Sequence, residues 1–229
     1  MESDFKEYPK TLAPDDFWGQ IKRSVNGQPV SEEQIQMIVA TIKGALAFQP
    51  EDRLLDLACG NGALSRYFFD DCAEVYGVDY SEVLIEVAKR YFEQQPLRRF
   101  DLADVGEYIV AETNPARFTK VLCYGSFPYF PEATARLVLT TLCRDYSQVE
   151  RVFIGNLPDL ERYQDFYTDG RDHSAELKHH DSKIGIWRSA EEFCQLAADC
   201  GWQAHIQRMP QGFYTAHYRY DALLERAHP

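Results

Sequence analysis

The chain reads Leu54-Leu55-Asp56-Leu57-Ala58-Cys59-Gly60-Asn61-Gly62-Ala63-Leu64-Ser65 at the point that decides its fold. The leucine-rich stretch 53–57 predicts a buried strand, and the small residues that follow predict a tight loop. Gly60 and Gly62 can take backbone angles that a side chain would forbid. A helix is expected next, from about Gly62 to Asp70. This order is typical of an open parallel sheet, whose ligands bind at the carboxyl ends of the strands.

Strand and helix patterns alternate along the rest of the chain. Further strands are expected at 75–79, 97–100, 120–124 and 151–154, with a closing antiparallel pair near 204–207 and 214–220. Helices are expected after Ser81, over 132–146 and after Ser189, where Glu192 completes a capping box. The pattern predicts an α/β fold with a doubly wound, mainly parallel, seven-stranded sheet that helices cover on both faces.

The segments outside this alternation suggest how the chain is organised. Residues 1–50 are expected to form an N-terminal helical cap, with a helix that begins after Ser31 and ends before Pro50. Residues 51–229 are expected to form the α/β domain. Within it, residues 157–187 are polar and lack a clear period, so we expect an irregular insertion or lid on the substrate side.

Charge and cysteine usage narrow the class of partner. The formal net charge is −12, from 36 acidic and 24 basic residues, which disfavours binding to nucleic acid or to an anionic membrane. None of the six cysteines forms a Cys-x-x-Cys pair or stands at metal-ligand spacing from a histidine. The acidic N-terminus does not resemble a secretory signal. We expect a cytoplasmic protein with a small-molecule partner, no metal and an oligomeric state that the sequence leaves open.

The glycine loop is compatible with two kinds of nucleotide ligand. A dinucleotide site prefers a third glycine where this chain has Ser65, and Asp56 would repel a pyrophosphate placed close to it. An ammonium group would instead be attracted by the Asp56 carboxylate. S-adenosylmethionine carries an ammonium, a sulfonium and no phosphate, so the charges favour it over a nicotinamide dinucleotide.

The stretch from Leu55 to Gly62 resembles the first motif of the class I S-adenosylmethionine-dependent methyltransferases, and the resemblance extends over roughly residues 51–156. Ala58 replaces the first glycine of the commonest form of this motif. The resemblance implies that S-adenosylmethionine is the cofactor, and that the residues of the loop and of the strand before it bind it: Asp56, Ala58, Gly60, Asn61 and Gly62.

Two later motifs keep the order of this family. Asp79 would bind the two ribose hydroxyls, and Tyr80 would flank the adenine. Asp101 would accept a hydrogen bond from the adenine amino group, with the backbone of Leu102 nearby and Asp104 as the alternative acceptor.

Two further residues complete the cofactor site that the resemblance implies. Tyr124 lies in the segment whose family counterpart runs beside the methionine part of the cofactor. Arg23, ahead of the helix after Ser31, is a candidate for binding the cofactor carboxylate.

The sequence indicates the methyl acceptor less clearly than it indicates the cofactor. Transfer to a hydroxyl needs a base, and His173, His179 and His180 in the irregular segment are the candidates. The segment 126–129 lacks the Asp/Asn-Pro-Pro-aromatic run typical of enzymes that methylate the amines of bases. We expect methylation of a small molecule, with a hydroxyl, including a sugar hydroxyl, favoured over an amine. The alternatives are a nicotinamide-dependent oxidoreductase and a non-catalytic module that binds S-adenosylmethionine.

Overall fold

The computed structural model describes residues 5–25 and 28–227. Its helices are α1 (Phe17–Gln20), α2 (Glu32–Leu46), α3 (Glu82–Tyr91), α4 (Val105–Ala111), α5 (Glu132–Asp145), α6 (Tyr163–Phe166) and α7 (Ala190–Asp199). Its strands are β1 (Ser24–Val25), β2 (Gln28–Pro29), β3 (Arg53–Leu57), β4 (Glu74–Asp79), β5 (Arg98–Leu102), β6 (Lys120–Tyr124), β7 (Arg151–Pro158), β8 (Trp202–Gln207) and β9 (Arg219–Arg226).

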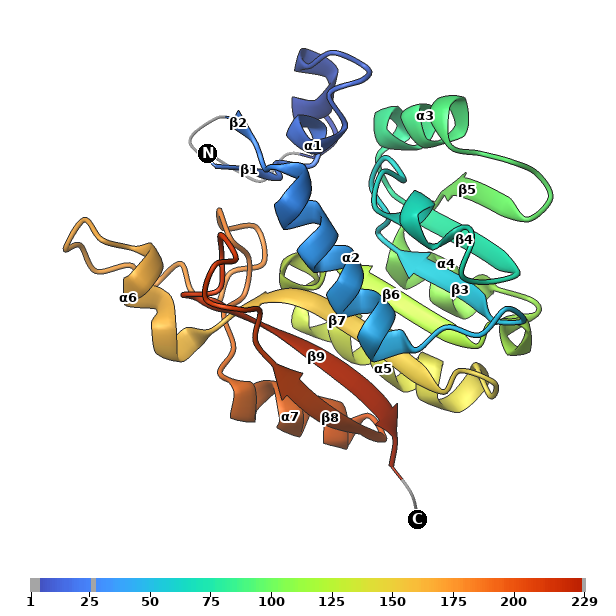
Figure 1. Cartoon of the computed structure of the whole chain (residues 1–229). Coiled ribbons are helices and arrows are strands. Elements are labelled where there is room, and N and C mark those ends of the chain that lie inside the picture. The colour runs from blue at the N-terminus through green and yellow to red at the C-terminus, as the bar shows by residue number, and fades with distance from the viewer. Residues whose placement is uncertain (1–4, 26–27, 228–229) are drawn as a thin grey trace.

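Seven of these strands form one twisted sheet in the order β5-β4-β3-β6-β7-β9-β8 (Figure 1). The first five strands in this order run parallel, and β9 pairs antiparallel with both β7 and β8. The strand order reverses direction next to β3, which is where open α/β sheets bind their ligands. The predicted doubly wound, seven-stranded sheet is confirmed.

Helices pack on both faces of the sheet. Helix α2 buries its apolar side against Leu54, Leu122 and Phe153 on one face, and α3 packs in a separate cluster around Phe100. Helices α4, α5 and α7 cover the opposite face, in a second cluster that contains Leu55. None of the helices among the described residues combines the length and the apolar character that crossing a membrane requires.

Several local predictions are confirmed by the structure. Strand β6 has the expected bounds, and α2 starts after Ser31, whose hydroxyl accepts a hydrogen bond from the Gln34 backbone. The capping box of Ser189 and Glu192 is present at the start of α7. Local rules sufficed here because capping and amphipathic spacing act within a few residues of each other.

Other local predictions were wrong. The helix expected at 62–70 is only a 3₁₀ turn, Ser65–Phe68, because the Ser65 side chain turns inward to bond Asp56 and the Phe68 ring is buried under α2. Helix α4 was not expected. Strand β9 begins at Arg219 rather than at 214, because residues 213–218 form turns whose rings pack on other elements.

The segment 157–187 has more structure than the sequence predicted. Its first residues extend β7 to Pro158, and a short α6 follows. Further on, Leu177, Ile184 and Trp187 are buried together with Tyr218 in a separate small apolar cluster. Most of the segment lacks regular structure, but it is packed on its own core.

Candidate functional site

The glycine loop, residues 58–62, joins β3 to the 3₁₀ turn after it. Ala58, Gly60 and Gly62 all have left-handed backbone angles, with φ of 55°, 60° and 74°. A Cβ atom at Gly62 would lie 2.9 Å from the ring of Phe100. Only glycine fits this turn without strain, so the two predicted glycine positions are explained, while Ala58 adopts the same region at a steric cost.

Asp79, the last residue of β4, ties the loop to the neighbouring strand. One carboxylate oxygen accepts the N–H of Gly60 and the other accepts the N–H of Ser81, each at 2.9 Å. Burial raises the pKa of Asp79 to about 6. Each carboxylate oxygen has a second lone pair, so the group can still accept hydrogen bonds from a diol laid across this edge.

Asp56 lies inside the sheet beneath the same loop. Its carboxylate accepts a 2.6 Å hydrogen bond from the Ser65 hydroxyl, and the side chain is buried. Burial raises the pKa of Asp56 to about 7, and the nearby charge of Asp79 adds to the shift. A cation placed at this point would stabilise the ionised form of Asp56.

The N-terminal segment covers the glycine loop from outside (Figure 1). The side-chain amide of Asn61 donates to the Phe17 carbonyl and to the Gln20 side chain, both at 2.8 Å. A Cβ at Gly60 would lie 3.0 Å from the side chain of Ile21. Asn61 therefore holds α1 in place, a contact that the sequence did not predict.

Arg23 follows this cover and is buried next to β6. Its guanidinium lies over the ring of Tyr124, 4.8 Å from the centroid, and 5.6 Å from that of Trp18. The Nη1 atom has no hydrogen-bond partner among the described residues. The charge of Arg23 also acts on Asp56 and lowers the pKa of that carboxyl, against the larger effect of burial. The result is a buried cation with a free donor beside the glycine loop.

Among the described residues, no hydrogen bond or ion pair joins Asp101 to the loop. Its neighbour Phe100 packs on the α3 side of the sheet, and Asp101 faces the other way, where it accepts hydrogen bonds from Tyr76 and Arg99. Although burial acts in the opposite direction, the Tyr76 hydrogen bond and the charges of Arg99 and Lys89 hold the pKa of Asp101 below its usual range. These partners already occupy the carboxylate.

The other residues expected to contact the adenine lie near the same strand ends. Tyr80 and Leu102 are partly exposed, at 38% and 52%. The carboxylate of Asp104, the alternative adenine acceptor, accepts the N–H groups of Gly106 and Glu107 and caps α4. The assignment of the adenine contacts stays a prediction.

The three candidate histidines lie in the 157–187 segment. His173 stacks on Tyr167 and bonds Asp169, and this hydrogen bond raises the pKa of the imidazole. His179 and His180 are exposed. No hydrogen bond among the described residues joins these histidines to the glycine loop, so their role as a base stays a prediction.

The residues at this edge fit S-adenosylmethionine. A free donor on a buried arginine suits a carboxylate, a buried acid beside it suits an ammonium, and the Asp79 carboxylate suits a ribose diol. The backbone of the loop can approach a ligand closely, because no side chain projects from Gly60 or Gly62.

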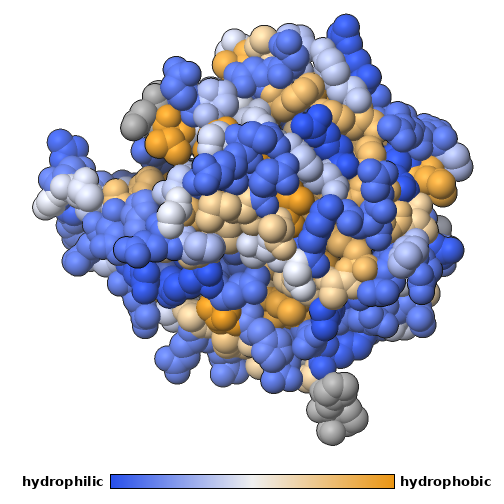
Figure 2. Space-filling model, in the orientation of Figure 1, coloured by the Kyte–Doolittle hydropathy of each residue, from blue (hydrophilic) through white to orange (hydrophobic). Residues whose placement is uncertain are grey.

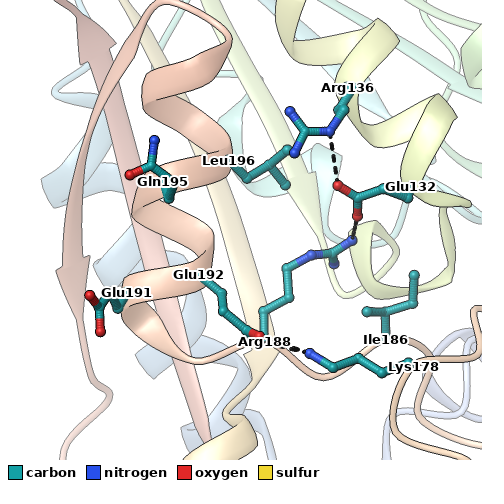
Figure 3. Close-up of a pocket in the computed structure, with 9 residues that line it drawn as sticks. All are labelled: Glu132, Arg136, Lys178, Ile186, Arg188, Glu191, Glu192, Gln195 and Leu196. Carbon is teal, nitrogen blue, oxygen red and sulfur yellow. Dashed lines mark hydrogen bonds and ion pairs between the residues drawn. The ribbon is translucent and has the colours of Figure 1, made fainter.

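An open groove lies elsewhere, between the N-terminal ends of α5 and α7 (Figure 3). Its cationic side chains are already paired: Arg188 with Glu132 at 2.6 Å, and Lys178 with Glu192 at 2.9 Å. Arg188 Nη1 has no hydrogen-bond partner among the described residues, but Glu132 already supplies the counterion of Arg188, and the groove has no glycine loop, so we do not place the site there.

Comparison with known proteins agrees with this reading. Residues 54–145 match the family model described as a methyltransferase domain. A ubiquinone biosynthesis O-methyltransferase of Coxiella burnetii is 31% identical over 121 residues, which cover 51% of this chain and 47% of the relative. The chain spans about half the length of the curated relatives it matches most extensively.

Solved structures support the same fold. A putative S-adenosylmethionine-dependent methyltransferase from Listeria monocytogenes has a TM-score of 0.63 at 14% identity, over 85% of this chain and 99% of its own. Magnesium protoporphyrin IX methyltransferase from Synechocystis, solved with S-adenosylhomocysteine, has a TM-score of 0.59 at 18% identity, over 85% and 83%. The family match favours a methyltransferase over an oxidoreductase, and these structures share the fold of this chain.

Proposed function

The chain contains a class I S-adenosylmethionine-dependent methyltransferase domain, and from this premise we propose that it methylates a hydroxyl group of a small-molecule acceptor. The observation that carries the proposal is the buried edge made by the glycine loop, Asp79 and Arg23. This edge matches a ligand that carries a diol, an ammonium and a carboxylate.

The chain's own residues would hold the cofactor by its polar parts. Arg23 would bind the carboxylate, Asp56 the ammonium and Asp79 the ribose, while the loop backbone would pack against the methionine chain. The cofactor supplies a methyl group that its sulfonium has already activated. The protein therefore has to align the acceptor, exclude water and take up a proton.

Two observations support a small acceptor with a hydroxyl. The curated relatives that match over the longest stretch carry the name O-methyltransferase. The net charge of −12 works against a polyanionic acceptor, and Figure 2 shows apolar residues on this face only as patches between hydrophilic ones. The proposal therefore prefers a metabolite to a nucleic acid.

The first test is methyl transfer to an undefined mixture. The protein is incubated with S-adenosylmethionine and a metabolite extract, and mass spectrometry searches for products heavier by one methylene. We expect at least one such product, absent when the protein is left out. Binding of S-adenosylhomocysteine without any product would instead favour the non-catalytic alternative.

The second test concerns Arg23. Arg23→Ala should weaken binding of S-adenosylhomocysteine by about tenfold to a hundredfold, because a hydrogen bond to a charged group contributes about 1.5–3 kcal/mol. The matched control is Arg90→Ala, on the exposed side of α3. Equal affinity of both variants in a calorimetric titration would refute the role of Arg23.

A further inference from the structure

Unpaired polar atoms gather at the other end of the sheet edge, where β6 and β7 end and β9 begins. Three buried atoms there have no hydrogen-bond partner among the described residues: Tyr124 Oη, Asp221 Oδ2 and Arg219 Nε. Tyr124 is 7% exposed and Asp221 is 2% exposed. Leaving a buried polar group unpaired costs about 1–3 kcal/mol, so such a cluster points to a ligand.

The sheet register places Tyr124 and Asp221 at the same level of the sheet, and we call these two residues the row. Tyr124 on β6 lies opposite Gly155 on β7. On the other side of β7, Ala222 pairs with Ile154 and Tyr220 with Leu157, so Asp221 lies level with the bulge that Gly155 opens. Tyr124 and Asp221 therefore flank the same point of β7.

The two side chains also share one face of the sheet. Tyr124 packs in the α2 cluster, whereas Tyr220 and Ala222 pack in the cluster on the opposite face. Because side chains alternate along a strand, Asp221 faces the α2 side. The charge of Asp221 contributes, after burial, to raising the pKa of Tyr124.

Gly155 makes room between them. A Cβ atom at this position would overlap the ring of Tyr124, so the ring lies across β7. Neighbouring strands are about 4.8 Å apart, so β6 and β9 are separated by about 10 Å, and the Tyr124 ring spans much of this gap. Beside Asp221 lies a small cavity that Asn156, Thr215 and Arg219 also line.

The backbone fixes Asp221 without using its second oxygen. Oδ1 accepts the N–H of Asn156 at 2.7 Å, and Asn156 has a left-handed φ of 65°. Arg219 donates to the carbonyl of the same Asn156 through Nη1, which leaves Nε unpaired. A carboxylate and a guanidinium are thus held side by side, each with a free atom.

This row adjoins the proposed cofactor site. Arg23 lies over the Tyr124 ring and also influences Asp56 under the glycine loop. The Ser126 hydroxyl, just after β6, donates to the carbonyl of Ala58 in that loop at 3.4 Å. An acceptor held by Tyr124 and Asp221 would therefore lie next to the methionine part of the cofactor.

Building on the proposed function, we infer that Asp221 is the catalytic base, that Tyr124 hydrogen-bonds the reacting oxygen, and that the acceptor is a small hydroxy acid whose anionic group binds Arg219. An anionic group suits Arg219, because its Nε is unpaired and Arg23 is taken by the cofactor carboxylate. Asp221, the carboxylate beside Arg219, loses its charge when it takes up the proton. Tyr129, Tyr214 and Tyr218 lie close to Arg219 and enclose this end of the site.

The step balances as a displacement. The acceptor oxygen forms a bond to the methyl carbon, the carbon–sulfur bond breaks with its electron pair left on sulfur, and the hydroxyl proton passes to Asp221. The protonated carboxyl then returns this proton to solvent when the products leave.

The environment of Asp221 suits a base near neutral pH. Burial raises its pKa to about 6, against the hydrogen bond from Asn156 and the charge of Arg219. Asp221 in turn acts on Tyr124 of β6, which Arg23 and Tyr214 also influence. The rate is expected to rise as the pH passes through about 6, because only the carboxylate accepts the proton.

The test uses defined acceptors and the full chain. The probes are lactate, glycerate and the three hydroxybenzoates, each beside its uncharged amide, with S-adenosylmethionine as donor. We expect at least one acid to be methylated in clear preference to its amide. Arg219→Gln should raise KM for that acid at least about tenfold, since a buried charge-assisted bond is lost.

Variants of Asp221 and Tyr124 distinguish a catalytic role of these residues from a purely structural one. Asp221→Asn keeps an acceptor for the Asn156 N–H and should lower kcat/KM by about 100-fold or more, with loss of the rise near pH 6. Tyr124→Phe should lower it by about tenfold. Glu225→Gln, a half-buried carboxylate at the other end of the same strand that pairs with Arg151, is the matched control and should keep the wild-type rate and pH profile.

Failure of this inference differs from failure of the proposed function. If none of the defined acids is methylated while the metabolite extract yields a methylated compound, the assignment of the acceptor as a small hydroxy acid is overturned. An unchanged pH profile in Asp221→Asn, or a loss of rate on His173→Ala with Asp221→Asn fully active, overturns the base. Absence of product in both mixtures overturns the proposed function itself.

Discussion

The proposed cofactor site and the proposed acceptor site differ in how their buried carboxylates are hydrogen-bonded. At the ends of β3 and β4, the buried carboxylates are bound by the protein itself: Asp79 by two backbone N–H groups and Asp56 by a hydroxyl. At the ends of β6, β7 and β9, buried polar atoms of Tyr124, Asp221 and Arg219 lack partners.

The difference separates a prebuilt site from one that its ligand completes. The cofactor end is organised before binding, since its loop geometry depends on internal hydrogen bonds. The cofactor end also has unpaired atoms, Arg23 Nη1 and Ser81 Oγ, but both oxygens of its Asp79 carboxylate are bound. At the acceptor end Asp221 keeps one carboxylate oxygen unpaired beside Arg219 Nε, and the cost of such atoms is removed when a ligand of matching chemistry binds. We therefore expect the cofactor end to bind S-adenosylmethionine tightly and the acceptor end to select among acceptors.

The largest expected effect is on stability, through Asp56. A carboxyl whose pKa is raised from 3.8 to about 7 holds its proton in the folded state while the unfolded chain has lost it. The free energy of unfolding therefore falls as the pH rises from about 4 to about 7 and stays lower above that. Asp56→Asn should remove most of this slope and be more stable than the wild type at pH 8, by up to about 4 kcal/mol.

Chemical unfolding of both proteins at pH 5 and pH 8 measures this. Asparagine keeps an acceptor for Ser65, so packing should survive the change. A variant destabilised equally at both pH values would show that Asp56 is needed in its charged form, and the cofactor end would then lose its status as a self-contained site.

The next effect concerns cofactor binding. Asp79→Ala leaves the N–H groups of Gly60 and Ser81 without acceptors and removes the expected ribose contact. Affinity for S-adenosylhomocysteine should fall by about 1–3 kcal/mol. Asp70→Ala, an exposed carboxylate after the 3₁₀ turn, should leave the titration unchanged. If Asp79→Ala binds like the wild type, the loop is not organised by β4.

The smallest effect tests the loop backbone by itself. Gly62→Ala should destabilise the fold by about 1–3 kcal/mol, because its φ is +74° and the new Cβ meets the Phe100 ring. Gly44→Ala, at an exposed position within α2 where a Cβ meets nothing within 4 Å, should stabilise it by up to about 1 kcal/mol. Denaturant midpoints that move in the same direction for both would contradict the assigned strain.

Local sequence patterns were sufficient for most elements. Capping residues at Ser31 and Ser189 and the apolar spacing of α2, α3 and α5 act over one or two turns, so a single pass along the chain finds them. The patterns misassigned the turn after Gly62 and the start of β9, where distant contacts override propensity. Ser65 bonds Asp56, and the rings of residues 213–218 pack on other elements.

The sequence alone determined where most strands and the longer helices lie along the chain, the glycine loop and the class of cofactor, since these follow from neighbouring residues and from a linear motif. Only the tertiary structure decided that α1 covers the loop through Asn61, that Arg23 reaches Tyr124, and that Asp221 lies level with Gly155. These pairs are far apart in the chain, and no local rule links them. Their proximity follows from strand order and register, which exist only once the whole sheet has formed.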